Sequence, residues 1–326
     1  METLLLIIKF TVGLVLILKG ADWLTDGASS IAHRFNIPSL VIGLTIVAFG
    51  TSAPELVVSV LSAVEGKTEM AIGNVVGSNL FNTLAIMGTT AIIFPVACSK
   101  NNIRYDVPFC LLASGLLMVM ALHGGEISRL DGILLLCFFL VFMAYTFRIA
   151  RSSKKRDEGD GQPAAMAMWK AILLFLVGLG SLLFGGEWLV DGASGIASLL
   201  GVSQSIIALT IVAAGTSFPE LVTSVMAARK GDTDMAMGNV LGSNIFNILL
   251  ILGVSSTVAP LSLGNITEFD LSIMTGGVVL LWFFCTYGKK YHYIERYEGI
   301  CLLLVAVAYY VWAVMKATGF TFSSIV

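Results

Sequence analysis

The chain carries the stretch GLTIVAFGTSAPE at residues 43–55 and a close copy of it, ALTIVAAGTSFPE, at residues 208–220. Each copy places one carboxylate, Glu55 or Glu220, in an otherwise apolar segment directly after a proline. An ionised side chain inside a bilayer costs at least about 2.5–3.5 kcal/mol, so such a carboxylate requires a partner or a function. Two of them at matching positions predict one shared site between two related halves.

The composition is that of an integral membrane protein. Of the 326 residues, 57% are hydrophobic and only 12% are charged, and the mean hydropathy is +0.90. Soluble domains carry about 25% charged residues, and apolar runs long enough to cross a bilayer recur along this chain. No basic face indicates binding to nucleic acid. The five cysteines show neither a CxxC spacing nor a disulfide pattern.

Ten apolar segments predict an all-α polytopic membrane protein with ten transmembrane helices. A charged run follows the fifth segment and is predicted to be a flexible linker. The predicted domains are a first five-helix repeat at 1–150, the linker at 151–167 and a second five-helix repeat at 168–326. The apolar segments lie near residues 3–24, 38–64, 70–96, 105–122, 131–149, 168–190, 203–228, 235–260, 269–286 and 298–316.

The two repeats are duplicates of one sequence. An offset of 220 − 55 = 165 relates Glu220 to Glu55, and the same offset relates GNVLGSN at 238–244 to GNVVGSN at 73–79. Because each repeat has an odd number of spans, the second is expected to enter the membrane inverted. Lys and Arg concentrate in loops on the side of the linker, which predicts a cytoplasmic linker and both termini outside. Inverted repeats with interrupted polar segments are typical of alternating-access transporters.

Oxygen-bearing residues surround both carboxylates. Pro54 and Pro219 cannot donate a backbone hydrogen bond, so each helix is expected to break there and free carbonyl groups for a ligand. Ca²⁺, Na⁺ and Mg²⁺ prefer such hard oxygen ligands, whereas zinc, copper and iron prefer sites with His or Cys. All three histidines lie in loops or at segment ends, which disfavours a soft metal. The side-chain oxygen donors around the carboxylates are Thr51, Ser52, Ser78, Asn82 and their repeat mates Thr216, Ser217, Ser243, Asn247.

The motifs GTSxPE and GNxxGSN, present in both halves, resemble the α-repeats of the calcium/cation antiporter superfamily, the sodium/calcium exchangers. The likeness is closest to ten-helix prokaryotic members, including bacterial calcium/sodium antiporters of the inner membrane, and covers essentially the whole chain. The resemblance implies that the protein is a transporter and not an enzyme. Such a transporter exchanges Na⁺ for Ca²⁺, binds these ions as substrates and needs no cofactor. The ligands that the resemblance implies are Glu55, Glu220, Thr51, Thr216, Ser52, Ser217, Ser78, Ser243 and backbone oxygens of Ala48 and Ala213.

Asn82 and Asn247 complete the predicted cation-binding set, and Asn247 departs from some relatives. Several exchangers have an Asp at this position, on which the potassium-dependent branch relies. An amide here argues against K⁺ co-transport and leaves two carboxylates in the pocket. Three bound Na⁺ would then leave one net positive charge, so we expect electrogenic exchange of about three Na⁺ per Ca²⁺, as the resemblance implies.

Other functions stay open at this stage. A proton/calcium exchanger would use the same carboxylates as proton carriers. A cation channel also needs oxygen ligands, but no pore-type filter sequence is present, and a cation sensor would need an output domain. Residue types alone do not separate Ca²⁺ from Mg²⁺ or Mn²⁺. Because both halves together complete one site, we expect a functional monomer in contact only with its ions and the lipid bilayer.

Two further groups of polar residues favour structural roles. Four asparagines in the GNxxGSN motifs are expected to form contacts between helices. Four acidic residues near helix ends are expected to anchor the protein at the headgroup level or to cap helices, with weak cation attraction as the alternative. The first group is Asn74, Asn79, Asn239 and Asn244, and the second is Asp22, Asp26, Glu187 and Asp191.

Overall fold

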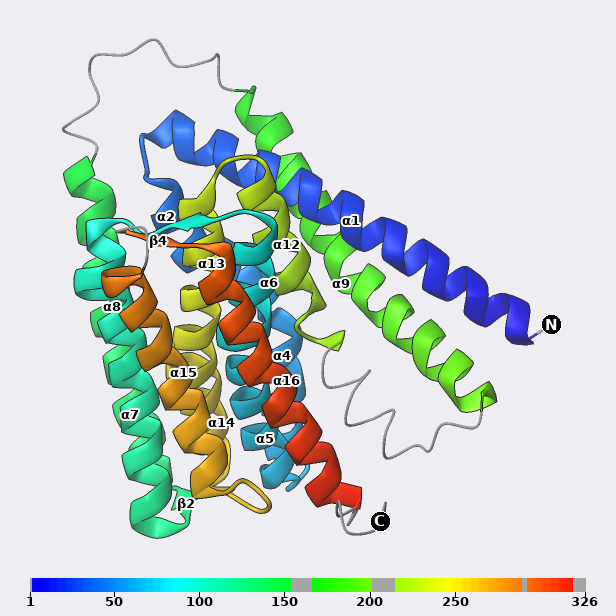
Figure 1. Cartoon of the computed structure of the whole chain (residues 1–326), viewed down its shortest axis with the longest axis vertical. Helices are drawn as coiled ribbons and strands as arrows, with labels where there is room; N and C mark the ends of the chain where they lie inside the picture. The colour runs from blue at the N-terminus through cyan, green and yellow to red at the C-terminus, as the bar shows by residue number, and fades with distance from the viewer. Residues whose placement is uncertain (1, 154–165, 201–214, 289–291, 319–326) are drawn as a thin grey trace.

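The protein is almost entirely helical in the computed structural model, which describes residues 2–153, 166–200, 215–288 and 292–318 (Figure 1). Eight described helices are long and apolar enough to cross a membrane, and a helix pair bent by 50°, at 39–51 and 53–64, is a further candidate. The seventh predicted span, 203–228, is described only from Gly215 onward. The chain is therefore an all-helical, multi-span membrane protein, as the composition predicts.

The first half consists of long helices interrupted by short π-helical segments, labelled η, and two short strands. Its elements are α1 (Glu2–Phe35), α2 (Ser39–Ile42), η1 (Gly43–Val47), α3 (Ala48–Thr51), α4 (Ala53–Val64), α5 (Thr68–Leu80), η2 (Phe81–Ile86), α6 (Met87–Ile93), β1 (Val96–Ala97), η3 (Asn102–Asp106), α7 (Val107–Gly124), β2 (Glu126–Ile127) and α8 (Arg129–Ser153).

The described part of the second half repeats this order. Its elements are α9 (Met168–Leu199), α12 (Phe218–Arg229), α13 (Thr233–Ile245), η5 (Phe246–Leu252), α14 (Gly253–Val258), β3 (Leu261–Ser262), α15 (Glu268–Tyr287), β4 (Tyr293–Ile294) and α16 (Arg296–Thr318).

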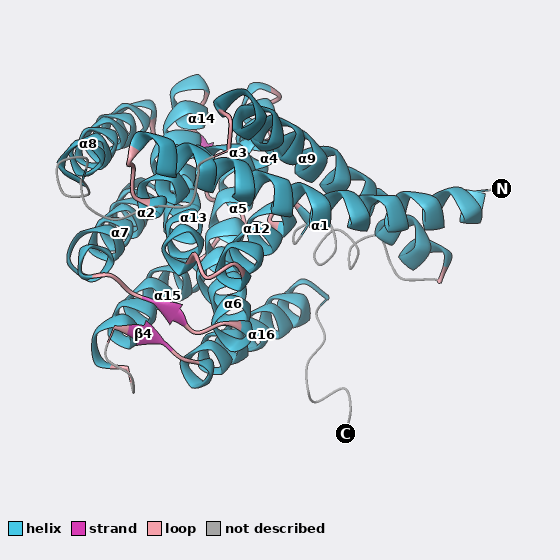
Figure 2. Ribbon diagram, turned by 90° about the horizontal axis from the view of Figure 1, so that it is seen from above, coloured by secondary structure: helices cyan, strands magenta, loops and turns pink. Residues whose placement is uncertain are grey.

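Helices α1 and α9, which begin the two halves, pack against each other in antiparallel directions. A Cβ atom on Gly13 would come 2.8 Å from the carbonyl oxygen of Gly185, and one on Gly27 would come 2.6 Å from that of Ala171. Residue numbers thus rise along α1 as they fall along α9. The close approach depends on small residues, as in many membrane helix pairs. Figure 2 shows the N-terminal part of α1 projecting beyond the other helices.

Two short strand pairs interlock the halves. Val96 of β1 pairs with Ile294 of β4, and Leu261 of β3 pairs with Ile127 of β2, both antiparallel. At each end of the bundle, one strand of the first half therefore pairs with one strand of the second. We call the end with β4, where α8 ends and α9 begins, the linker face, and the end with β2 the opposite face; they lie at the top and bottom of Figure 1.

The centre of the bundle is formed by α13 and η5 of the second half, and α13 packs mainly against α2, η1 and α3 of the first. Every residue from Met235 to Ile245 in α13 is buried. Close approach requires glycine at the crossing with the first half, since a Cβ on Gly238 would come 2.6 Å from the carbonyl oxygen of Leu40. This crossing brings the two motif-bearing stretches to the middle of the molecule.

Candidate functional site

The helix that carries each motif breaks directly before its proline, as predicted. Ser52 has φ −83° and ψ 8°, between α3 and α4, and Ser217 has φ −92° and ψ 4°, before α12. The prolines occupy the first turn of the new helices, where a missing backbone N–H is tolerated. The break places each serine at a corner, and the glutamate that follows lies in the first turn of α4 or α12.

The two glutamates meet in the interior through crossed hydrogen bonds between the halves. Ser52 Oγ donates to Glu220 Oε1 at 3.2 Å, and Ser217 Oγ donates to Glu55 Oε1 at 3.4 Å. All four side chains are at most 2% exposed. The structure therefore brings together the residues that the duplicated stretches placed in separate halves.

The second oxygen of each carboxylate is buried without a partner. Neither Glu55 Oε2 nor Glu220 Oε2 accepts a hydrogen bond from any described residue, and no ion pair among those residues includes either glutamate. Buried polar atoms are nearly always paired, and an uncompensated buried carboxylate is strongly destabilising. Two such oxygens in one enclosed place suit a cation, with hydroxyl and amide oxygens close by.

Asn74 and Asn239 hold the two glutamate helices by identical contacts. Asn74 Nδ2 donates to the carbonyl oxygen of Glu55 at 3.3 Å and to Ser59 Oγ at 2.9 Å. Asn239 Nδ2 makes the same bonds to the Glu220 carbonyl and to Ser224 Oγ, again at 3.3 Å and 2.9 Å. These bonds tie α5 to α4 and α13 to α12. Both asparagines thus make the helix–helix contacts expected from the sequence.

The predicted amide ligands lie in π-helical segments, which the sequence did not reveal. Asn82 is the second residue of η2, and Asn247 is the second residue of η5. Asn247 Nδ2 donates to Asn79 Oδ1 at 3.0 Å, which leaves its Oδ1 without a described partner. Neither amide atom of Asn82 has a partner within the described ranges. Single-turn π segments inside α-helices often accompany functional sites.

The remaining predicted ligands are placed as follows. Ser78 and Ser243 are buried on α5 and α13, and Thr51 Oγ1 lies 3.2 Å from Asn239 Oδ1. The Ala48 carbonyl oxygen accepts a bond from the Ser52 N–H at 2.9 Å and lies 3.3 Å from Thr51 Oγ1, so the break does not free this carbonyl as expected. Thr216 is partly buried, and its hydroxyl has no described partner. Ala213 lies outside the described residues.

A cavity of about 620 Å³ lies between α4 and α9 beside the break that precedes each proline. Pro54 and Val57 line it on α4, and Thr216 and Pro219 line it beside the second motif. Glu187, one of the acidic residues expected at the headgroup level, lies on its α9 wall. Through Thr216, the cavity reaches the edge of the candidate site.

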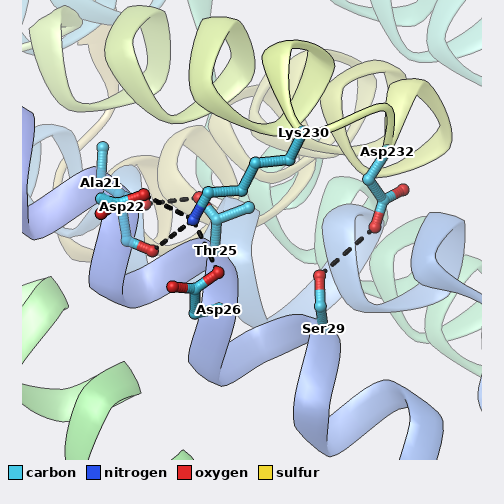
Figure 3. Close-up of polar contacts among 7 residues, drawn as sticks. All are labelled: Ala21, Asp22, Thr25, Asp26, Ser29, Lys230 and Asp232. Carbon is cyan, nitrogen blue, oxygen red and sulfur yellow. Dashed lines mark hydrogen bonds and ion pairs between the residues drawn. The ribbon is translucent and has the colours of Figure 1, made fainter. Parts of the chain in front are cut away.

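The other acidic residues of that group form ion pairs that the sequence did not predict. Lys230 binds Asp22 and Asp26, and Lys9 binds Asp191 at 3.0 Å (Figure 3 shows the first group). Lys230 and Asp22 are 208 positions apart, so no local pattern could have linked them.

The described residues contain no group of three or more His, Cys, Asp or Glu side chains that could hold a metal ion. This finding agrees with a site of two carboxylates and neutral oxygen donors. Such a donor set fits hard cations and not zinc or copper.

Comparisons with known proteins identify the family. The family described as sodium/calcium exchanger protein matches residues 5–148 and again residues 170–315. CaxA of Alkalimonas amylolytica is 38% identical over 91% of this chain and 95% of its own length. The inner membrane protein YrbG of Escherichia coli is 34% identical over 76% of this chain and 78% of its own.

A solved structure has the same fold. The sodium–calcium exchanger NCX_Mj, soaked with Na⁺ and Sr²⁺, superposes with a TM-score of 0.82 at 31% identity, over 94% of this chain and 97% of that one. Both halves of the chain match the family separately, and the fold agrees over nearly its whole length. The chain therefore belongs to the sodium/calcium exchanger family of membrane cation antiporters.

Proposed function

We propose that this protein is a secondary active antiporter that exchanges Na⁺ for Ca²⁺ by alternating access. The hydrogen bonds of Ser52 with Glu220 and of Ser217 with Glu55 support this function. One oxygen of each carboxylate is bound by a serine of the other half, and the second oxygen stays unpaired. Two carboxylates balance the charge of one Ca²⁺ or of two Na⁺, so either ion can displace the other.

The proposed cation ligands are the twelve residues derived from the motifs. The carboxylates of Glu55 and Glu220 form the centre of the set. Hydroxyls, amide oxygens and two backbone carbonyls are proposed to complete the set, which suits the irregular coordination by six to eight oxygens that Ca²⁺ accepts. The neutral members are Thr51, Thr216, Ser52, Ser217, Ser78, Ser243, Asn82, Asn247 and the carbonyls of Ala48 and Ala213.

We further propose that the exchange is electrogenic, with about three Na⁺ per Ca²⁺, because only two carboxylates are available to neutralise three positive charges. The linker is proposed to face the cytoplasm and both termini the outside, in the plasma membrane of a prokaryote. One chain is proposed to suffice for transport, since the paired carboxylates come from its own two halves.

Uptake of Ca²⁺ into proteoliposomes tests this function. Vesicles loaded with Na⁺ are compared with Na⁺-free vesicles, using the unaltered chain, Glu55→Gln, Glu220→Gln and the control Glu126→Gln. Glu126 is an exposed residue of β2 far from the buried site. We expect Na⁺-dependent uptake in the unaltered chain and the control, and loss in both site variants. An imposed membrane potential should change the rate.

The same experiment separates the alternatives. Uptake that does not depend on Na⁺ but requires a pH gradient would indicate proton/calcium exchange. The buried unpaired carboxylate oxygens also permit that reaction. Uptake without any counter-ion would indicate a channel. Normal exchange in Glu55→Gln or Glu220→Gln would reject the proposed site, and insensitivity to the potential would reject the charge imbalance.

A further inference from the structure

A polar cluster at the linker face fastens α1 to the end of α12. Lys230 Nζ lies 2.6 Å from Asp22 Oδ1 and 2.7 Å from Asp26 Oδ1, and it donates to the carbonyl oxygen of Asp22 at 2.9 Å. Figure 3 shows the ammonium group between the two aspartates on one side of α1. The Lys230 side chain is 28% exposed, so the cluster is partly shielded from solvent.

The loop after Lys230 adds a second contact to α1. Ser29 Oγ donates to Asp232 Oδ2 at 3.4 Å, and Asp232 Oδ1 also caps α13 by accepting from the Met235 N–H at 3.0 Å. The turn between them requires Gly231, whose φ is +85°. Lys19 and Arg229 line the adjoining surface pocket, and neither forms an ion pair with a described residue. The corner between α12 and α13 is thereby held against α1.

The repeat mate of this corner carries the opposite charges. The offset of 165 relates Lys230 to residue 230 − 165 = 65, which is Glu65, and Asp232 to residue 232 − 165 = 67, which is Lys67. The loop therefore reads KGD at the linker face and EGK at the opposite face. The acidic pair on the facing helix keeps its sign, because Asp22 and Asp26 correspond to Glu187 and Asp191.

The two corners also differ in structure. At the opposite face, Glu65 pairs with Lys67 of its own loop at 2.7 Å, and both side chains are more than half exposed. The cavity of about 620 Å³ lies between α4 and α9 on the side of the break toward this face, with Glu187 and Asp191 on its wall. At the linker face, Lys230 bridges the corresponding helices instead.

We propose that Lys230, Asp22, Asp26, Ser29 and Asp232 form a latch that holds the linker face closed, and that the reversed loop charges prevent an equal latch at the opposite face. Closing the opposite face in the same way would bring Glu65 toward the like-charged carboxylates of Glu187 and Asp191, of which Lys9 pairs with the second alone. The chain therefore rests with the linker face closed and with the cavity between α4 and α9 open. This inference rests on the proposed alternating access, in which both faces open in turn.

Single cysteines report which face is open. Val57 on α4 lines the cavity, and its repeat mate, residue 57 + 165 = 222, is Val222 on α12. Full-length Val57→Cys and Val222→Cys are purified in detergent without Na⁺ or Ca²⁺ and treated with a charged thiol reagent. Labelling at each position is measured by mass spectrometry of its peptide, so the native cysteines stay in place.

Loss of the latch should shift labelling from one face to the other. Lys230→Glu is expected to raise the labelling rate of Val222→Cys about three- to tenfold and to lower that of Val57→Cys, as for loss of a partly exposed ion-pair network. Arg229→Glu is the matched control, because it makes the same charge change one residue away. None of the described ion pairs includes Arg229.

Exchanging the charges tests the pairing itself. Lys230→Asp combined with Asp26→Lys should restore the original labelling ratio. If Lys230→Glu does not fold, Lys230→Met removes the charge, keeps the apolar stem and should give a smaller shift in the same direction. An unchanged ratio, or an equal shift in Arg229→Glu, overturns the latch. Labelling requires no flux, so a latch failure with intact Na⁺-dependent uptake is distinct from a failure of the proposed exchange.

Discussion

The two halves are nearly identical around the buried carboxylates. The corresponding loops at the two faces, in contrast, carry their charges in reversed order. Asn74 and Asn239 make the same pair of hydrogen bonds with the same lengths, 2.9 Å and 3.3 Å. The loops only a few turns away read EGK at 65–67 and KGD at 230–232. A site between two halves requires both to present the same donors, whereas nothing in cation binding constrains the loops.

This difference separates two properties of an alternating transporter. Equivalent donors from both halves let one set of ligands hold the cation whichever face is open. A charge difference at the faces changes the energies of the two conformations without touching the ligands. The following predictions test the equality of the halves at the site and their inequality elsewhere.

The largest expected effect is the loss of either buried carboxylate. We expect Glu55→Gln and Glu220→Gln each to weaken Ca²⁺ binding at least about 100-fold, because each removes half of the buried negative charge that compensates the cation. Calorimetric titration of the purified chain with Ca²⁺ measures the effect, with Glu126→Gln as the unaffected control. A loss confined to one of the two variants would show that the halves bind the ion unequally.

Glycines at the central crossing should be needed in both halves. Alanine at Gly43 would place its Cβ 2.6 Å from the carbonyl oxygen of Met235, and alanine at Gly238 would meet that of Leu40 at 2.6 Å. Overpacking of this kind costs about 1–3 kcal/mol, so we expect each variant to unfold several degrees lower in a thermal scan. Gly276→Ala in α15 is the matched control.

At Gly276 a Cβ would meet no described atom within 4 Å, and alanine favours a helix over glycine. That variant should keep or raise the midpoint of unfolding. Equal destabilisation by all three substitutions would mean that close approach at the crossing is not the cause of the loss.

The sequence predicted the parts of this fold that rest on local chemistry and on the repeat. Pro54 and Pro219 predicted the breaks, and the offset of 165 predicted that Glu55 and Glu220 occupy equivalent places. That the two carboxylates meet in space could be inferred only from their apolar surroundings, in which an isolated ion is unfavourable. The breaks and the meeting of the carboxylates are both seen in the structure, while cation binding stays a proposal.

Other features depend on information that a residue pattern lacks. The π-helical segments that contain Asn82 and Asn247 differ from α-helix by one residue in hydrogen-bond register, and their composition is equally apolar. The bond between Lys230 and Asp22 depends on how α1 packs across the bundle. Hydropathy placed Lys230 correctly at a helix end, but it placed Asp22 near the end of a span at 3–24, whereas α1 continues to Phe35. It could not pair the two residues.

Asparagines that support the glutamates should have intermediate and equal effects. Asn74→Ala and Asn239→Ala each remove two hydrogen bonds and leave a glutamate carbonyl and a serine hydroxyl without their donor. A buried group left unpaired costs about 1–3 kcal/mol, so we expect Ca²⁺ affinity to fall about tenfold in either variant. Titration with Ca²⁺ measures the affinity of each variant directly. A clear difference in affinity between the two variants would contradict the symmetry of the site.

The smallest effect is expected where an ion pair joins helices that need not part. Lys9 of α1 binds Asp191 of α9 at 3.0 Å, with side chains 33% and 49% exposed. Pairs this exposed contribute about 0–1 kcal/mol, so Lys9→Met should change the midpoint of unfolding little. It should also leave the labelling ratio of Val57→Cys to Val222→Cys unchanged, because α1 and α9 are already held together by close glycine contacts. A shift in that ratio as large as the one from Lys230→Glu would mean that the balance between the faces follows the net charge of α1 and not the contact between α1 and the α12–α13 corner.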